Sequence, residues 1–256
     1  MSEGIIQIVK DTIKSCIGLQ NNHLKVCLTP EIRLAQALID AGIENPAMLT
    51  KLTITGTLNI ADCKYIRKKM NSSLQELDIS KASIEENRIP KKAFEGCWAL
   101  LSVIMPDTVT EIRKNAFGFC TGLTSIIIPN SVTEIGELAF YYCSGLTSIV
   151  IPNSVIKIRF RAFAKCASLI SIVIPDSVIK IESGAFGDCT EVTSLTLPDT
   201  DIEIGNYAFA NCTSLTSFVI PQRVVRIGEG AFDKVPAIHP PSAEADEANV
   251  SETNID

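Results

Sequence analysis

Short alternations of apolar and polar residues return along the chain at nearly constant intervals. In one of them, Leu123, Ile126 and Ile128 predict a short strand with inward apolar side chains, because side chains alternate between the two faces of a strand. Pro129 follows and ends the strand, since proline has no N–H to donate. Patterns of the same kind begin at Leu49, Leu74 and Leu100. The first two intervals are 25 and 26 residues, and the later ones are 23.

Three residue types keep the 23-residue step most strictly. The phenylalanine column is Phe94, Phe117, Phe140, Phe163, Phe186, Phe209 and Phe232. The cysteine column is Cys97, Cys120, Cys143, Cys166, Cys189 and Cys212, and the proline column is Pro106, Pro129, Pro152, Pro175, Pro198 and Pro221. Fixed periods of this size indicate a solenoid of stacked coils. No single coil can bury its own core, so stability comes from contacts between neighbours.

Between one strand and the next, Val132, Ile135, Ala139, Phe140 and Cys143 carry the inward face around the coil. The spacing of the last three predicts a short helical turn. Each coil then has a strand on one side and a looser arc on the other, and neighbouring strands pair in parallel to form one sheet face. We therefore expect an α/β solenoid dominated by strands.

The amino terminus predicts an amphipathic helix, because Ile5, Val9, Ile13 and Ile17 lie four residues apart. A secretion signal is not expected, since charged residues interrupt the apolar run and no basic segment precedes it. The helix either packs on the first coils or lies on a membrane surface. The mixed charge of its polar face favours packing.

A second N-terminal element is the strand predicted at residues 23–28, HLKVCL. Thr29 then caps a helix over residues 31–40, with Pro30 in its first turn and Gly42 after its end. These elements together form a cap, which the end of a solenoid needs because an end coil otherwise exposes apolar side chains and unpaired strand groups.

The chain divides into three segments: an N-terminal amphipathic helix and helical cap at 1–45, a solenoid of 23–26-residue coils at 46–238, and a disordered acidic tail at 239–256. The tail holds much of the net charge of −6, so the folded body is nearly neutral and a nucleic-acid partner is not expected. No apolar run is long enough to span a membrane. No cap precedes the tail, which makes self-association through the open C-terminal edge an expectation.

Nine cysteines raise the question of disulfides or zinc. Zinc needs four ligands that converge on one point, whereas six of these thiols lie along a line with no histidine nearby. Side chains in register also point in parallel, which disfavours bridging. We expect free, buried thiols in a packing role, which Val235 supports by taking the cysteine place in the last coil. No role is assigned to Cys16, Cys27 and Cys63.

Candidate catalytic groups are scarce. His23 and His239 lie outside the regular coils, so neither has a built-in nucleophile or carboxylate partner. No glycine-rich phosphate loop is present either. We expect no enzyme activity, no cofactor and no metal site.

The outward side chains of the predicted strands form columns of hydroxyl and β-branched groups without a charge. The candidate ligand-binding residues are Thr124, Ser125, Ile127, Thr147, Ser148, Val150, Ser171, Val173, Ser194, Thr196, Ser217 and Val219. Such a face fits an extended peptide or another protein, although β-branched residues also simply suit a strand. Both interpretations remain open at this point.

A column of charged residues marks the opposite face. Its members are Glu111, Glu134, Lys157, Lys180, Glu203 and Arg226. The alternating signs predict attraction between Glu134 and Lys157 and between Lys180 and Glu203, each worth less than about 1 kcal/mol when exposed. We interpret this face as a solvated surface.

The repeat unit from Phe117 to Ile135, F-x-x-C-x-x-L-x-S-I-x-I-P-x-S-V-x-x-I, resembles the leucine-rich repeat of the BspA-like family, the Treponema pallidum type. Residues 49–67 and 73–80 also resemble the first repeats of surface proteins of this family in Bacteroides-like bacteria. The resemblance implies a leucine-rich repeat superhelix. It also implies a cell-surface or secreted adhesin that attaches to host matrix proteins or to other microbes.

The function expected from these features is non-enzymatic binding of a protein or another macromolecule on the strand face. A cell-surface adhesin or host-interaction protein is the first hypothesis. The alternative is a cytoplasmic scaffold for protein–protein interaction, which the missing leader peptide and the many reduced cysteines favour.

Overall fold

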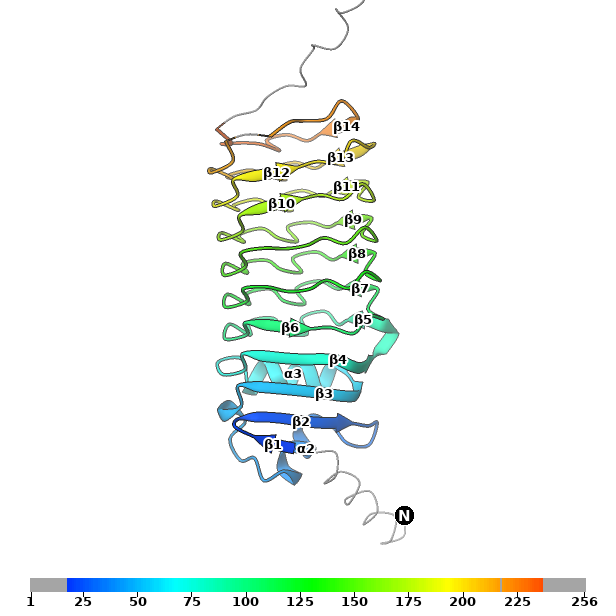
Figure 1. The fold of residues 1–256 in the computed structure, drawn as a ribbon, viewed down its shortest axis with the longest axis vertical. Coiled ribbons are helices and arrows are strands. Elements are labelled where there is room, and N and C mark those ends of the chain that lie inside the picture. The colour runs from blue at the N-terminus through cyan, green and yellow to red at the C-terminus, as the bar shows by residue number, and fades with distance from the viewer. Residues whose placement is uncertain (1–17, 217, 237–256) are drawn as a thin grey trace, which may run out of the picture.

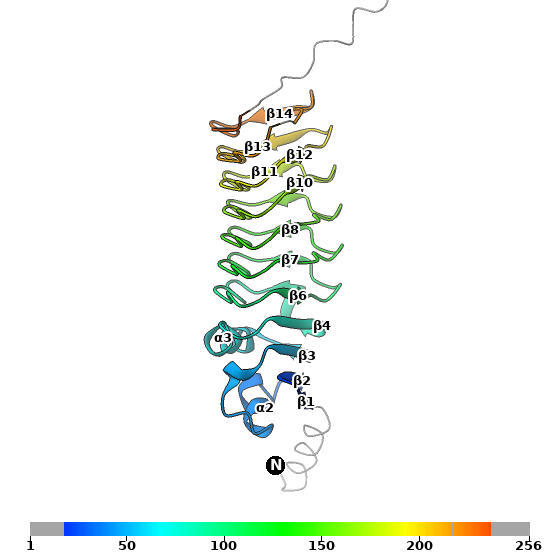
Figure 2. The same ribbon diagram turned by 60° about the vertical axis from the view of Figure 1, so that its left-hand side comes forward.

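A computed structural model describes residues 18–216 and 218–236 of the 256-residue chain, and its coils stack along one long axis (Figure 1). Figure 2 shows the same regular stack from another side. The β-dominated repeat solenoid that the repeats predict is confirmed. None of the helices in the described part combines the length and the apolar character needed to cross a bilayer.

Several predicted features lie outside the described residues. They are the amphipathic helix ending at Ile17, the tail at 239–256, and the single residues Cys16, Ser217 and His239. The division of the chain at residues 46 and 239 stays a prediction.

The first sheet lies on the side of the predicted strands. Its order is β1 (Gly18–Gln20), β2 (His23–Leu28), β3 (Lys51–Leu58), β4 (Glu76–Ile84) and β6 (Ser102–Ile104). β1 is antiparallel to β2, and all other pairs are parallel. The strand predicted at 23–28 is thus confirmed. Farther along the same face, Ile127 forms a bridge with Val150, and β10 (Ser171–Val173) pairs with β12 (Ser194–Thr196).

A second parallel sheet occupies the arc where no strand is predicted. Its seven strands, in chain order, are β5 (Arg88–Ile89), β7 (Glu111–Ile112), β8 (Glu134–Ile135), β9 (Lys157–Ile158), β11 (Lys180–Ile181), β13 (Ile202–Ile204) and β14 (Val224–Ile227). The charged column therefore lies on a sheet of its own. Each strand from β5 to β13 also directs an isoleucine into the core.

The short helical turn predicted from Ala139 to Cys143 is wrong, because the structure has hydrogen-bonded turns there. The backbone N–H of Phe140 donates to the carbonyl of Ala162 in the next coil, at 2.7 Å between nitrogen and oxygen. A helix would direct that N–H back along its own segment instead. Pairing between coils thus prevails over local helix formation.

Helices occur near the N-terminal end. They are α2 (Leu34–Asp40), η1 (Pro46–Met48), α3 (Ile60–Lys69) and η2 (Glu85–Asn87). The prediction that Thr29 caps α2 is wrong: its hydroxyl oxygen accepts from the N–H groups of Glu31 and Ile32 in a separate turn. Arg33, still extended, precedes the helix, and the carboxylate of Asp62 accepts from the N–H of Leu34 at 2.9 Å.

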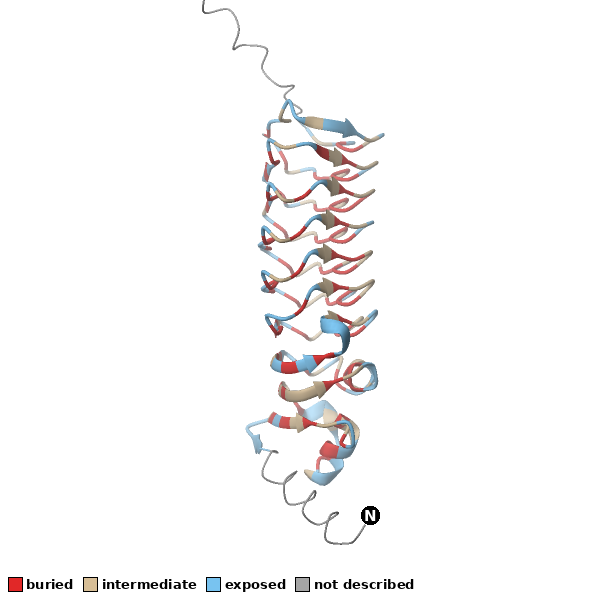
Figure 3. Ribbon diagram, turned by 90° about the vertical axis from the view of Figure 1, so that its right-hand side faces the viewer, coloured by how far each residue is buried: buried red, intermediate tan, exposed pale blue. Residues whose placement is uncertain are grey.

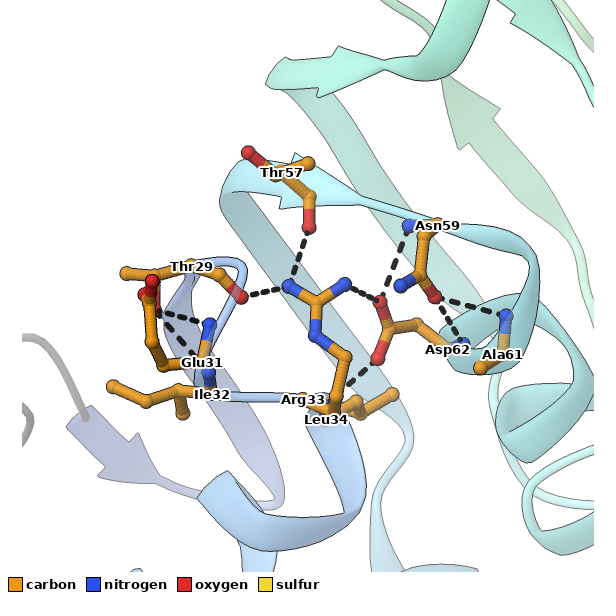
Figure 4. A network of polar contacts seen from close by, with 9 residues as sticks. All are labelled: Thr29, Glu31, Ile32, Arg33, Leu34, Thr57, Asn59, Ala61 and Asp62. Carbon is orange, nitrogen blue, oxygen red and sulfur yellow. Dashed lines mark hydrogen bonds and ion pairs between the residues drawn. The ribbon is translucent and has the colours of Figure 1, made fainter.

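Asp62 is the one buried charged or polar residue of the described core, with 1% of its surface exposed (Figure 4). It belongs to a capping box with Asn59 at the start of α3, an element that the strand periodicity does not predict. Arg33 pairs with it at 3.0 Å between Nη1 and Oδ2, and also donates to the carbonyls of Thr29 and Thr57. One carboxylate thereby joins α2 to α3.

The core is a continuous column of phenylalanine rings, and buried residues line the interior of the stack (Figure 3). Neighbouring ring centroids from Phe94 to Phe232 lie 5.1–5.4 Å apart. From Phe117 onward the planes differ by at most 6°, so each ring stacks on the next one. The rings therefore repeat once per coil along the stack.

The cysteine column is free and buried, as predicted. It also makes hydrogen bonds, since the thiol of Cys143 donates to the carbonyl of Phe117 at 3.1 Å and the thiol of Cys166 donates to that of Phe140 at 3.3 Å. Cys120, Cys189 and Cys212 repeat this contact. The thiols thus satisfy a carbonyl of the previous coil, which a valine of similar volume could not do.

Because the column thiols are buried, the free energy of unfolding depends on pH in the alkaline range. Burial raises the pKa of the Cys166 thiol to about 12, from an ordinary value of 9.0. The folded state then holds this proton more tightly than the unfolded state, so the stabilisation is complete below about pH 9 and is lost as pH rises toward 12. We expect the free energy of unfolding to fall by up to about 1.4 kcal/mol per pH unit for each such thiol.

Urea denaturation between pH 8 and pH 11 measures this effect. Cys166→Ala serves as the matched variant, because it is less stable throughout but should lose stability less steeply with pH. Parallel curves for the two proteins would contradict the assignment.

In the wild type, the six column thiols should react with a maleimide only after unfolding.

Candidate functional site

The outward side of the first sheet carries a line of exposed apolar side chains. We call it the strand-face ridge: Ile104, Ile127, Val150, Val173, Thr196 and Val219. Ile127 and Val150 are each 77% exposed, and Val173 lies directly beside Thr196 in the register of β10 and β12. A row of side chains this exposed contributes little to the core. Such contiguous apolar surface is typical of an interaction site.

Hydroxyl groups flank the ridge in two columns with different hydrogen bonding. The hydroxyls of Thr124, Thr147 and Thr193 each donate to a carbonyl of the previous coil at 3.3 Å. These threonines therefore belong to the ladder between coils. Ser125, Ser148 and Ser194 are exposed, whereas Ser102 and Ser171 are half-buried.

The candidate residues of the described chain therefore lie on one face. The threonine hydroxyls are engaged in the ladder, while the ridge and the exposed serines face solvent. A partner would thus meet a row of aliphatic side chains beside the hydroxyls, which precede the ridge residue in each coil.

The same face becomes charged toward its N-terminal end. In the register of β2, β3 and β4, His23, Lys51 and Glu76 continue the serine column, and Lys51 pairs with Glu76 at 2.5 Å between Nζ and Oε2. Burial, and then the neighbouring Lys51 and Lys25, lower the pKa of His23. The 25- and 26-residue steps from Lys51 to Glu76 to Ser102 are the sequence signal for this extension.

The charged column on the second sheet is a network of ion pairs. The predicted pair of Lys180 with Glu203 is confirmed at 2.8 Å between Nζ and Oε2. The predicted partner of Glu134 is wrong, because Arg159 reaches it at 2.9 Å and also binds Glu182 at 2.8 Å. The longer guanidinium bridges two coils at once. Glu111, Glu134, Lys180 and Glu203 of this column are thus held in ion pairs, whereas Lys157 and Arg226 are in none among the described residues.

Chemistry for a metal or for catalysis is sparse in the described part. No three His, Cys, Asp or Glu side chains within it gather as metal ligands. His23 contacts the hydroxyl of Thr53 at 2.9 Å and lies in the charged end of the strand face. This hydroxyl is the one partner of the ring among the hydrogen bonds of the described residues, where no carboxylate orients His23 as the third member of a triad would.

A family model described as the BspA type leucine rich repeat region matches residues 87–189 and 156–243, with six copies of the repeat. The chain belongs to the BspA-type leucine-rich repeat family. The coils before residue 87 lie outside the matched ranges, but β3 and β4 continue the same sheet. No curated protein matches the chain.

Solved structures agree with this assignment. A leucine-rich repeat protein of Treponema pallidum is 28% identical, with a TM-score of 0.50, and the match covers 68% of each chain. A leucine-rich repeat protein of Bacteroides ovatus is 22% identical, also with a TM-score of 0.50, over 70% of this chain and 50% of that one. A leucine-rich cell surface protein of Faecalibacterium prausnitzii is 26% identical over 77% of this chain and 68% of that one, with a TM-score of 0.42. The BspA-type chain thus spans about half the length of the Bacteroides protein.

Proposed function

We propose that this BspA-type chain is a non-enzymatic binding protein whose strand face captures another protein or macromolecule. The observation that carries the proposal is the strand-face ridge, with Ile127 and Val150 each 77% exposed in the middle of the stack. The charged column offers less, since its ion pairs are already satisfied within the chain. Desolvating satisfied ion pairs costs free energy, whereas covering exposed aliphatic groups gains it.

The shape of the ridge indicates the form of the partner. Its members repeat once per coil along the stack, so a partner with an extended apolar or β-branched surface can contact several of them together. The backbone beneath the ridge is already paired between coils, so side chains make the contacts. The exposed serines beside the ridge supply hydrogen bonds at its rim.

The finer proposal is a cell-surface or secreted adhesin that attaches to a host matrix protein. The family resemblance of the repeat supports it. The alternative is a cytoplasmic scaffold for protein–protein interaction. Eight free cysteines in the described residues favour this alternative, because disulfides form and persist mainly in oxidising compartments.

Charge substitutions test the binding face. Val150→Glu combined with Val173→Glu places two carboxylates on the ridge and should abolish capture of purified matrix proteins while unfolding remains cooperative. Surface plasmon resonance against collagen, laminin and fibronectin measures the capture. The loss should be large, because each carboxylate must be desolvated to form the contact.

The chain offers a matched control for this experiment. Ile156 and Ile179 are also exposed, but they adjoin the second sheet at β9 and β11. Ile156→Glu with Ile179→Glu should leave capture intact. The strand face is not the site if the two double variants lose capture equally. It is also not the site if Val150→Glu with Val173→Glu captures matrix proteins as well as the wild type does.

Location separates the two functional hypotheses. Protease treatment of intact source cells should release fragments of this chain if it is an adhesin, because the protease reaches only exposed proteins. A cytoplasmic marker protein, retained in the same cells, is the control. Complete protection of the chain until lysis would overturn the adhesin proposal in favour of the scaffold.

A further inference from the structure

A second exterior surface lies on the arc of the coils, two residues after each core phenylalanine. We call this column the turn edge: Gly96, Phe119, Tyr142, Lys165, Asp188, Asn211 and Lys234. All seven have a left-handed backbone, with φ between 58° and 74°. The conformation serves the stack, since the N–H groups of Phe119, Tyr142 and Lys165 donate to the next coil at 2.7, 2.9 and 2.8 Å.

Phe119 and Tyr142 are unexpected residues at these positions. A left-handed backbone favours glycine, asparagine and aspartate and is strained for bulky side chains. Both side chains are also largely outside the core, at 44% and 41% exposed. Neither side chain belongs to the buried core. Strain retained without a packing gain indicates a functional site.

The two rings form a platform together with Tyr141. The Phe119 ring lies 5.3 Å from Tyr141 and 5.8 Å from Tyr142, measured between centroids. In the next coil, Nζ of Lys165 lies 5.9 Å from the centre of the Tyr142 ring. The rings are inclined to one another, with Phe119 edge-on to Tyr141 and tilted against Tyr142, and the cluster has a cation at its border.

A cleft of about 300 Å³ continues the turn edge in the following coils. Gly184 and Gly187, which belong to one turn of one coil, line it without side chains. Arg161, Asp188, Asn211 and Tyr207 line it, and Asn211 Nδ2 donates to Asp188 Oδ1 at 2.7 Å. The stem of Arg161 lies over Gly184.

Tyr207 borders this cleft with a second strained aromatic ring. Its φ is 55°, its side chain is exposed, and its ring lies over Gly230 of the next coil, where any Cβ would collide with it. Its hydroxyl donates to Glu229 at 3.3 Å. Gly230, which has no side chain, thus leaves room for the Tyr207 ring beside the cleft.

The chemistry of the turn edge excludes two ligand classes. An extended peptide that pairs with backbone finds no free N–H groups from Gly96 to Asn211, because these six residues of the column each donate to the next coil. A nucleic acid would meet the carboxylates of Asp188 and Asp233 beside its phosphates. A neutral polar ligand with apolar faces suits both the exposed rings and the polar groups that line the cleft.

We propose that the turn edge is a carbohydrate-binding site, distinct from the strand face. Aromatic rings stack on the C–H faces of pyranose rings, and carboxylate, amide and guanidinium groups bond their hydroxyls. The core rings, one in each coil, lie 5.1–5.4 Å apart between centroids, a repeat comparable to the length of one sugar unit. A neutral oligosaccharide therefore lies along the stack from Phe119 to Asn211, with about one sugar unit for each coil.

Isothermal titration calorimetry tests the proposal with neutral hexasaccharides of β-1,4-linked glucose, N-acetylglucosamine and mannose and of α-1,4-linked glucose. At least one should bind the wild type. Tyr142→Gly should weaken its binding at least tenfold while the thermal midpoint stays equal or rises, since glycine relieves the left-handed strain. Tyr207→Ala at the cleft should weaken binding similarly and provides a second variant if Tyr142→Gly fails to fold.

Two controls separate loss of the sugar site from a change in backbone strain and from loss of the strand face. Lys92→Gly relieves a left-handed residue away from the platform and should leave sugar binding unchanged. The strand-face variant Val150→Glu with Val173→Glu should also bind sugar normally, so failure of one site is distinguishable from failure of the other. Absence of binding to all four hexasaccharides, or binding that survives both tyrosine variants, would overturn the proposal. Loss of matrix-protein capture but not of sugar binding in Tyr142→Gly would overturn it in favour of a protein partner.

Discussion

Pairing of the backbone between coils is the constraint on which the rest of the structure depends. The N–H groups of Phe117, Phe140 and Phe163 donate to carbonyls of the next coil at 2.7–2.8 Å, and the strands of both sheets repeat this arrangement. The first strands pair across steps of 25 and 26 residues, but an equal coil length keeps the strands on both sides of the later coils in register at once. Pairing on both sides therefore accounts for the strict 23-residue step, which in turn places each phenylalanine ring on the next and each thiol beside a carbonyl.

Since the interior is fixed by this repetition, variation is confined to the outside. Along the strand face the serine column gives way to His23, Lys51 and Glu76 at one end. Along the turn edge, one left-handed position holds Phe119 in one coil and Asp188 in another. A regular stack thus presents two surfaces of different chemistry, one aliphatic and one aromatic and polar, whose side chains can change without a change of fold.

The sequence predicts features that repeat. Phe163 marks the core and Val150 marks the outer face because neighbouring coils repeat both signals. The second sheet is hidden because its strands are as short as Glu134–Ile135, too short for an alternation to show. Asp62 caps Leu34 across 28 residues, a tertiary contact without a local signal, although Asn59 and Asp62 form a recognisable capping box for α3. Phe119 and Tyr142 have a left-handed backbone, a conformation that favours glycine, asparagine and aspartate. Their residue types therefore give no sequence signal for this conformation.

Native-state hydrogen exchange of the phenylalanine amides tests most directly whether the stability of each coil depends on the neighbouring coils. Phe140, Phe163 and Phe186 occupy central coils and donate to Ala162, Ala185 and Ala208. If pairing between coils holds the stack together, their N–H groups exchange only when the whole solenoid opens, with one shared free energy and one denaturant dependence. Exchange of each amide with its own much smaller free energy would show that coils open singly, and would contradict the account.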